Sequence, residues 1–283
     1  MSVELIESAR RRGVDVPSEP HTPAALGELA ASVFLHPTRS GRLVPREQAY
    51  LESAQRLSLT TSAGALAVWQ WGADEAPLVY FAHGWEGHGA QLGAFAAALV
   101  AAGFRVRTFD APGHGASPGD ETSVPHIARI LVELVSQSGG EIHAMIGHSM
   151  GAAAAAMSTL YGLKPRGLVL LAPPLSQMER ALRVASRMNL AGEVRAEFFA
   201  AVARRTGARY EDADMLNLAR RAPCPVVVFH DPADTDTSFV EAESIVAVWR
   251  GARLVACPGR GHYRLLATPA IVRQAVEFIR GLP

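Results

Sequence analysis

The sequence is poor in the residues that mark several classes of protein. It contains only two cysteines in 283 residues, which excludes a small domain whose fold is stabilised by several disulfide bonds. Its 27 basic and 27 acidic residues give a formal net charge of zero, so no overall field attracts the chain to nucleic acid or to an anionic membrane. We therefore expect neither a nucleic-acid partner nor a membrane partner. The small-molecule substrate that we expect instead follows from the motif around Ser149 and not from composition.

Long apolar runs are also missing. No stretch is apolar over the length that a membrane span needs, because glycine and serine interrupt the alanine-rich segments. Residues 1–12 mix glutamate and arginine with apolar residues and contain no apolar core of signal-peptide length, so we do not expect export. These features predict a cytoplasmic protein in which Cys224 and Cys257 stay reduced.

The positions of the two cysteines also argue against a disulfide between them. Cys224 precedes one expected strand, and Cys257 ends the next. If the two strands run parallel, the cysteines lie at opposite edges of the sheet, separated by roughly 16 to 20 Å of strand. A disulfide tolerates only roughly 7 Å between α-carbons.

Short β-branched or aromatic runs alternate with helical patterns along most of the chain. The expected strands are 57–61, 66–71, 78–82, 106–110, 142–146, 168–172, 226–230 and 254–257. Helical periodicity covers 91–102, 124–136, 149–161, 239–249 and 269–279. The continuous apolar run at 226–229 is typical of a strand that is covered on both faces. This alternation predicts a doubly wound α/β domain whose first two strands enter the sheet as an antiparallel pair.

Two segments lie outside this alternation. Residues 175–221 hold no strand candidate, only helix-forming stretches interrupted at Gly192 and Gly207. An ordinary crossover needs one helix, so we expect a small helical cap over the carboxyl edge of the sheet; an elongated crossover is the alternative. Residues 1–56 form an expected helical extension before a domain of residues 57–283. The extension would cover the cap or mediate a homodimer. The sequence does not decide between a monomer and a homodimer.

The run Gly147-His148-Ser149-Met150-Gly151 holds the first candidate for chemistry. It follows an apolar stretch and opens an alanine-rich one, which predicts a strand, a sharp turn and a helix. A G-x-S-x-G turn forces its central serine into a strained backbone conformation and lifts the hydroxyl above the sheet, while the glycines let strand and helix pass closely. Ser149 is therefore the candidate nucleophile.

A serine hydroxyl needs a base within hydrogen-bond reach and a third group that fixes the base. Among the ten histidines, His262 is the best placed, because it lies between the last expected strand and the last helix, on a loop that reaches back over the same sheet edge. His83 is expected to shape a turn, and His114 lies in a loop. His148 adjoins the serine on a sharp turn and should point away from it.

Three aspartates after the expected strand 226–230 are candidates for the carboxylate that orients the base. Asp234 is the first choice, since the loop needs a few residues after the strand to curl towards His262. Asp236 is the alternative. Asp231 would more naturally close the turn.

An acyl transfer also develops an oxyanion, which needs hydrogen-bond donors fixed in advance. The backbone N–H of Met150, at the start of its helix, is one candidate and gains from the helix dipole. The second is the backbone N–H of Trp85, in the loop after the expected strand 78–82. The indole of Trp85 either lines an acyl pocket or simply packs against its neighbours.

Two further sets of residues in 175–221 have alternative interpretations. Apolar side chains either form an adaptable lid over an acyl chain or pack the cap onto the domain; these are Met178, Met188, Phe198, Phe199 and Met215. Arg180, Arg183 and Arg187 fall near one helix face, where they either attract an anionic substrate or form a solvated face.

Together these residues resemble an α/β-hydrolase fold protein over roughly residues 57–283. The matching features are the His-Gly-Trp turn at 83–85, the segment 110–117, and Ser149, Asp234 and His262 in that chain order. The resemblance implies an α/β-hydrolase fold, with a mostly parallel eight-stranded sheet and a cap inserted after the sixth strand. It also implies hydrolysis of an ester, thioester, amide or lactone without a cofactor or a metal.

The sequence thus predicts a serine hydrolase that cleaves a carboxylic ester through an acyl-enzyme. An alternative enzyme activity is that of a thioesterase or acyltransferase acting on a carrier-bound acyl group. The alternative from another class is a ligand receptor that has kept this fold and lost turnover, although the intact Ser149, Asp234 and His262 argue against it.

Overall fold

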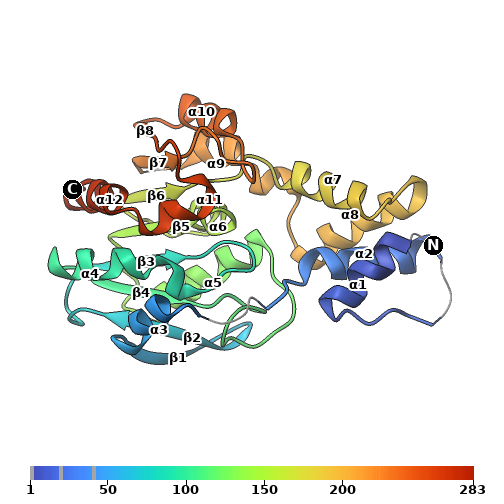
Figure 1. Ribbon diagram of the computed structural model, residues 1–283, viewed down its shortest axis with the longest axis horizontal. Helices are drawn as coiled ribbons and strands as arrows, with labels where there is room; N and C mark the ends of the chain where they lie inside the picture. Colours follow the sequence, from blue (N-terminus) through green and yellow to red (C-terminus); the bar gives the residue numbers. More distant parts are fainter. Residues whose placement is uncertain (1–2, 19–21, 40–42, 223) are drawn as a thin grey trace.

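The computed structural model describes residues 3–18, 22–39, 43–222 and 224–283, which form one sheet flanked by helices and a helical lobe beside it (Figure 1). The strands are β1 (Gln55–Thr61), β2 (Gly64–Trp71), β3 (Leu78–Ala82), β4 (Arg105–Phe109), β5 (Ala144–His148), β6 (Gly167–Leu171), β7 (Val226–His230) and β8 (Ala252–Ala256). The α-helices are α1 (Val3–Arg12), α2 (Pro23–Leu35), α3 (Pro45–Glu52), α4 (Gly93–Ala101), α5 (Val124–Ser136), α6 (Met150–Ser158), α7 (Gln177–Arg187), α8 (Gly192–Thr206), α9 (Met215–Arg221), α10 (Phe239–Val248), α11 (Gly261–Arg264) and α12 (Pro269–Arg280). Short 3-10 turns are η1 (Gly89–Leu92), η2 (Tyr210–Ala213) and η3 (Leu265–Ala267).

The eight strands form a single mixed sheet in the order β1-β2-β4-β3-β5-β6-β7-β8. β1 pairs antiparallel with β2, and β2 pairs antiparallel with β4, while the other neighbours are parallel. Strands β3, β5, β6 and β7 are buried throughout, whereas burial alternates along much of β1. The predicted fold, a mostly parallel eight-stranded sheet with an antiparallel entry, is confirmed.

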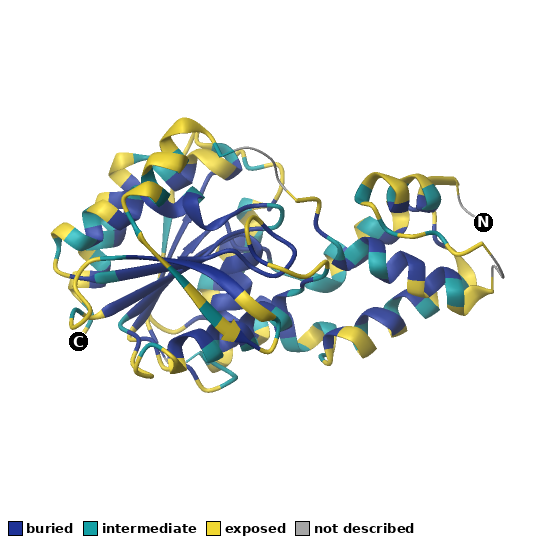
Figure 2. Cartoon of the chain, turned by 90° about the horizontal axis from the view of Figure 1, so that it is seen from below, coloured by how far each residue is buried: buried dark blue, intermediate teal, exposed yellow. Residues whose placement is uncertain are grey.

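The core consists of two apolar layers, one on each face of the sheet. Alternate residues of β3 separate to the two faces: Leu78 and Tyr80 join the layer with α5, α6 and α10, and Val79 and Phe81 join the layer with α4 and α12. Figure 2 shows the central strands buried along their length beneath these helices. Because both faces are covered, the sites available to a substrate lie at the ends of the strands.

The element boundaries agree with the sequence patterns best where local chemistry sets them. Helix α5 spans the predicted residues, and the hydroxyl of Ser123 caps it by accepting a hydrogen bond from the amide of His126 at 3.2 Å. Strand β5 lies two residues later than predicted, because Gly147 and His148 pair with Leu170 and Leu171 of β6. The strand therefore runs directly into Ser149.

Four helices form the helical lobe, which has an apolar core separate from that of the sheet. Helices α1 and α2 pack against α7 and α8 around buried residues such as Leu5, Val33, Ala185 and Phe198. A side chain at Gly27 of α2 would overlap the backbone of α8, so the two helices approach closely through this glycine. The lobe thus combines residues before the sheet with residues between β6 and β7 (Figure 1).

The apolar residues of 175–221 are used for packing. Met188 and Phe198 are buried in the core of the lobe, and Phe199 packs against it. Met215, in α9, is buried in the layer that covers the sheet. For these four side chains the structure shows the packing interpretation; Met178 is not part of either apolar core.

The two cysteines are free thiols, and both are buried, as predicted. Within the described ranges, no helix has the length and apolar character needed to cross a membrane.

Candidate active site

Ser149 lies on the turn that joins β5 to α6. Its backbone adopts φ 50° and ψ −119°, a left-handed conformation that is strained for a residue with a side chain. A side chain at Gly147 would collide with the backbone of Ala152, and one at Gly151 would collide with the carbonyl group of Ala82. The two glycines therefore let α6 pass close to the sheet, which is the geometry predicted for a nucleophile elbow.

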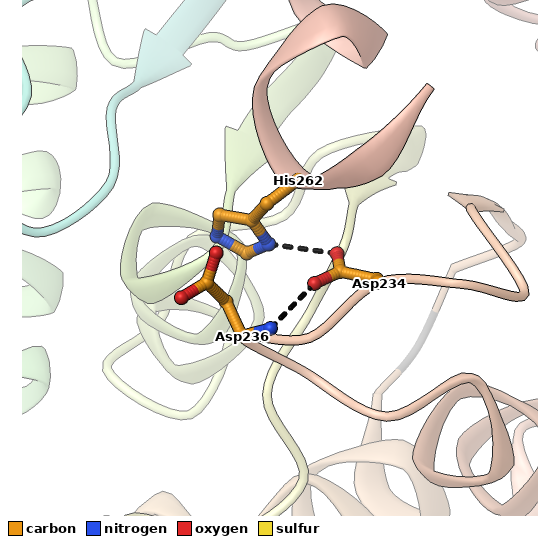
Figure 3. Close-up of side chains that lie close together, drawn as sticks. All are labelled: Asp234, Asp236 and His262. Atoms are coloured by element: carbon orange, nitrogen blue, oxygen red, sulfur yellow. Dashed lines mark hydrogen bonds and ion pairs between the residues drawn. The ribbon is translucent and has the colours of Figure 1, made fainter. Parts of the chain in front are cut away.

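His262 and Asp234 are joined by a hydrogen bond. The Nδ1 atom of His262, in α11, lies 2.8 Å from Oδ2 of Asp234, in the loop after β7 (Figure 3). The Asp234 carboxylate also accepts hydrogen bonds from the backbone amides of Asp236 at 2.8 Å and Thr237 at 3.1 Å. Burial alone would raise the pKa of Asp234, but these hydrogen bonds and the charge of His262 outweigh it and lower the pKa to about 2. Asp234 is thus an ionised, immobile partner for His262.

The other two aspartates of this loop lie differently. Asp231 ties the loop to the one after β8, because its carboxylate accepts the backbone amides of Ala233, Arg260 and Gly261. Asp236 is exposed, and its carboxylate points towards the second ring nitrogen of His262 (Figure 3). The structure therefore pairs His262 with Asp234, the first choice from the sequence, and gives Asp231 the turn-closing position expected for it.

Ser149 and His262 line one cavity of about 660 Å³ between the sheet and the helical lobe. Among the hydrogen bonds of the described residues, none joins the Ser149 hydroxyl to His262. Contacts of this kind are commonly loose in a site without substrate and tighten when substrate binds. With Nδ1 held by Asp234, Nε2 is the ring nitrogen that remains for proton transfer.

The residues that carry the two predicted oxyanion donors belong to segments beside Ser149. Met150 is the first residue of α6, where a backbone N–H has no partner inside its own helix. Trp85 follows Gly84, and a side chain at Gly84 would come within 3.2 Å of the Ser149 Cβ atom. The loop after β3 therefore runs directly beside the serine. The indole of Trp85 lines the cavity and stacks edge-on against His114, with ring centroids 5.9 Å apart.

Two buried histidines hold the loop after β3 in place. His83 accepts the backbone N–H of Ala111 on Nε2 at 2.9 Å, which leaves its proton on Nδ1, 2.8 Å from the carbonyl oxygen of Gly84. His114 likewise accepts the backbone N–H of Glu86 on Nε2 at 3.0 Å. These bonds give His83 and His114 the loop-shaping positions that the sequence suggested.

His148 has a position that the sequence analysis missed. Its side chain borders the same cavity as Ser149, and Nε2 lies 3.0 Å from the carbonyl oxygen of His262. The two imidazole rings are also in contact, with centroids 4.7 Å apart. His148 therefore supports the backbone of His262 from behind. No local sequence pattern signals this, because the two residues are 114 positions apart.

The stability of the fold is expected to depend on keeping these three histidines neutral. Burial lowers the pKa of His83 to about 4 and that of His114 and His148 to about 3. Below pH 6.5 the unfolded chain binds protons at these positions while the folded chain does not, so lowering the pH favours unfolding. We expect the free energy of unfolding to fall between pH 6.5 and 5 by on the order of 1 kcal/mol per pH unit for each histidine.

Chemical denaturation at pH 7.5, 6.5, 6 and 5 measures this dependence. Replacing one of the three histidines with glutamine should make the pH dependence shallower. The same replacement at the partly exposed His36 serves as the control and should leave the slope unchanged. A stability that does not change between pH 6.5 and 5 would contradict the expectation.

The segment before the sheet reaches the same cavity. Arg12, at the end of α1, forms an ion pair with Glu86 at 2.7 Å, and the backbone amide of Thr38 donates to the same Glu86 oxygen at 3.0 Å. The Arg12 guanidinium also donates to the carbonyl oxygen of His36 at 2.8 Å. Glu86 adjoins Trp85, so the helical lobe is connected directly to the loop that carries Trp85.

The side chains of Asp234, Asp236 and His262 are of types that can bind a divalent ion. One ligand atom from each lies within 4.8 Å of the others, and no second group of this kind is found in the described part of the chain. The hydrogen bond between Asp234 and His262 already engages two of the three members with each other.

Comparison with known proteins agrees with this architecture. A model of the alpha/beta hydrolase family matches residues 79–275. Similar solved structures include a thermophilic esterase from Thermogutta terrifontis (23% identity, TM-score 0.61, covering 81% of this chain and 99% of that one). A second is a monoacylglycerol lipase from Paleococcus ferrophilus (21% identity, TM-score 0.60, covering 77% of this chain and 99% of that one). A third is a thioesterase domain from the curacin biosynthetic pathway (18% identity, TM-score 0.60, covering 80% of this chain and 98% of that one). No curated protein sequence gives a significant match. The family model spans well over half of the sequence, and the chain belongs to the alpha/beta hydrolase family.

Proposed function

We propose that this hydrolase is a serine esterase with Ser149 as nucleophile, His262 as base and Asp234 as orienting acid. The observation that carries the proposal is the 2.8 Å hydrogen bond between Asp234 and His262 Nδ1, in a cavity that Ser149 also lines. The strained backbone of Ser149 supports it, because this conformation is found where a nucleophile is held exposed above a sheet.

The reaction proceeds in two steps. Nε2 of His262 takes the proton of the Ser149 hydroxyl as the oxygen attacks the ester carbonyl carbon, and the Asp234 carboxylate stabilises the imidazolium. The backbone amides of Met150 and Trp85 donate to the oxyanion of the tetrahedral intermediate. The imidazolium then gives its proton to the departing alcohol. Water repeats the sequence on the acyl-enzyme, releases the acid and restores the serine.

The helical lobe serves as the cap in this proposal. The cavity is walled on one side by the strand ends and on the other by α7 and the segment around Thr38, so the substrate enters between lobe and sheet. We keep the division predicted from the sequence, with an extension at 1–56, a hydrolase domain at 57–283 and an insertion at 175–221. Helices α1 and α2 of the extension and helices α7 and α8 of the insertion together form the cap.

Hydrolysis of p-nitrophenyl esters from acetate to dodecanoate tests the proposed function. We expect turnover with a chain-length optimum set by the cavity. A larger yield of product with an added alcohol or amine than with water would instead indicate an acyltransferase. The absence of turnover and of reaction with a fluorophosphonate, in protein shown to be folded, would contradict the esterase and favour a receptor.

A further inference from the structure

The cavity above Ser149 is strongly enriched in arginine. Its charged lining consists of Arg12, Arg39, Arg180, Arg183 and Arg187, against two carboxylates, Glu86 and Asp236. Lys164, the only lysine of the chain, is not among the lining residues. In a protein whose formal net charge is zero, this is a local excess of positive charge at the one place where a substrate would react.

Helix α7 supplies three of these arginines from a single face. Arg180, Arg183 and Arg187 are spaced three and four residues apart, which places them on one side of a helix. Ala181 and Ala185 lie on another side and are buried in the core of the lobe. Packing of this alanine side against α1, α2 and α8 therefore turns the arginine side towards the cavity, not towards bulk solvent alone.

Among the described residues, these three arginines form no ion pair. No described carboxylate lies within 4.0 Å of the guanidinium of Arg180, Arg183 or Arg187, whereas Arg12 is paired with Glu86 at 2.7 Å. The Arg180 guanidinium lies over the indole of Trp85, 5.7 Å from the ring centroid. Burial and the charge of Arg183 lower the pKa of Arg180, and the more distant carboxylates of Glu86 and Asp236 only partly oppose this.

We propose that the cavity selects esters that carry a second, anionic group, a carboxylate or a phosphate, on the part of the substrate that extends from Ser149 towards α7. This inference rests on the proposed esterase function and names its substrate class. A guanidinium offers several N–H donors in a planar fork that matches the oxygens of either anion, and it stays charged at any working pH. Arg180, whose guanidinium lies over the indole of Trp85, connects this arginine face to the loop beside Ser149.

Two esters with the same acyl chain test the proposal. Mono-p-nitrophenyl adipate carries a free carboxylate, and its methyl ester is the neutral counterpart. We expect the wild type to prefer the anionic ester by about tenfold or more in kcat/KM, the effect of one charge-assisted hydrogen bond. In Arg180→Gln and in the double variant R183Q/R187Q, the ratio of kcat/KM for the anionic ester to kcat/KM for the neutral ester should fall towards one.

The matched control is the double variant R250Q/R253Q. It also removes two positive charges, but from exposed positions outside the cavity. The ratio of kcat/KM for the anionic ester to kcat/KM for the neutral ester should therefore equal that of the wild type. Equal turnover of the two esters by the wild type would overturn the proposal while leaving the esterase function intact. An equal loss of the ratio in R250Q/R253Q would overturn it too, because the preference would then come from overall charge.

A binding measurement separates this proposal from the proposed function. Titration of the Ser149→Ala variant with adipate and with inorganic phosphate needs no turnover, and comparison of the two distinguishes a carboxylate site from a phosphate site. Binding that is lost when R183Q/R187Q is added supports the anion site, even if no ester is hydrolysed and the esterase proposal fails. Binding of neither anion, together with no preference between the esters, would overturn the inference.

Discussion

Ester hydrolysis is expected to fall by about four to six orders of magnitude in kcat when Ser149 is replaced by alanine. The replacement removes the only atom that forms the acyl-enzyme, while the oxyanion donors and the binding cavity remain. A small residual rate above that in water is expected from these remaining groups. The measurement is the hydrolysis of the best p-nitrophenyl ester of the panel, with burst-phase and steady-state rates recorded for both proteins.

Two controls keep this result interpretable. Ser244→Ala, in α10, removes a serine hydroxyl that bonds only to the carbonyl oxygen of Val240 and should leave turnover unchanged. Thermal unfolding of Ser149→Ala should resemble that of the wild type, since alanine keeps the Cβ atom and the backbone conformation at φ 50°. Retention of more than about a hundredth of the activity by Ser149→Ala would contradict Ser149 as nucleophile.

Replacement of Asp234 by asparagine is expected to lower kcat by about three to four orders of magnitude, whereas Asp236→Asn should change it by less than about tenfold. Asparagine keeps the shape of Asp234 but removes the charge that stabilises the imidazolium, and it can present an N–H to Nδ1 in place of an acceptor. Asp234 lies 2.8 Å from His262 Nδ1, while Asp236 is exposed.

Parallel assays of the two variants on one ester provide the test, and each variant is the control for the other. Both substitutions remove one negative charge from the same loop, so a general electrostatic effect would lower both rates alike. If Asp236→Asn lost more activity than Asp234→Asn, the carboxylate that acts during turnover would be Asp236. That result would contradict the assignment made here.

The sheet and the elbow could be predicted from local patterns. Continuous apolar strands such as β7 require cover on both faces, and helical periodicity between them predicts that cover. The two glycines around Ser149 are needed because strand β5 and helix α6 approach too closely for side chains there. Each of these features is determined by neighbours in the sequence, and for that reason the sequence predicts them.

Contacts between distant segments could not be predicted in the same way. Arg205 of α8 donates to the Ser32 hydroxyl of α2, 173 residues away, and periodicity identifies an apolar helix face without identifying its partner. For the same reason the sequence left open whether the arginine side of α7 attracts an anionic substrate or is a solvated face. The packing of Ala181 and Ala185 against the lobe turns this side towards the cavity.

The sequence predicts that an aspartate lies next to His262, but only the structure shows which of the three it is. The chain order of strands brings the loops after β7 and β8 together, so an aspartate next to His262 was expected. Which one it is depends on the course of a single turn, in which Asp231 accepts backbone amides of the β8 loop and Asp234 is left to face the histidine. Loop geometry of this kind has no periodic signal in the sequence.

Covalent labelling with a fluorophosphonate, followed by mass spectrometry of the peptides, tests the central claim most directly. The serine oxygen attacks the phosphorus of the probe and displaces fluoride, which leaves a phosphonate ester, and this occurs only where a base and oxyanion donors activate the serine. We expect one adduct per chain on Ser149, with ester turnover lost in proportion to labelling and no adduct in His262→Ala. An adduct on another residue, or none in folded protein, would contradict the account.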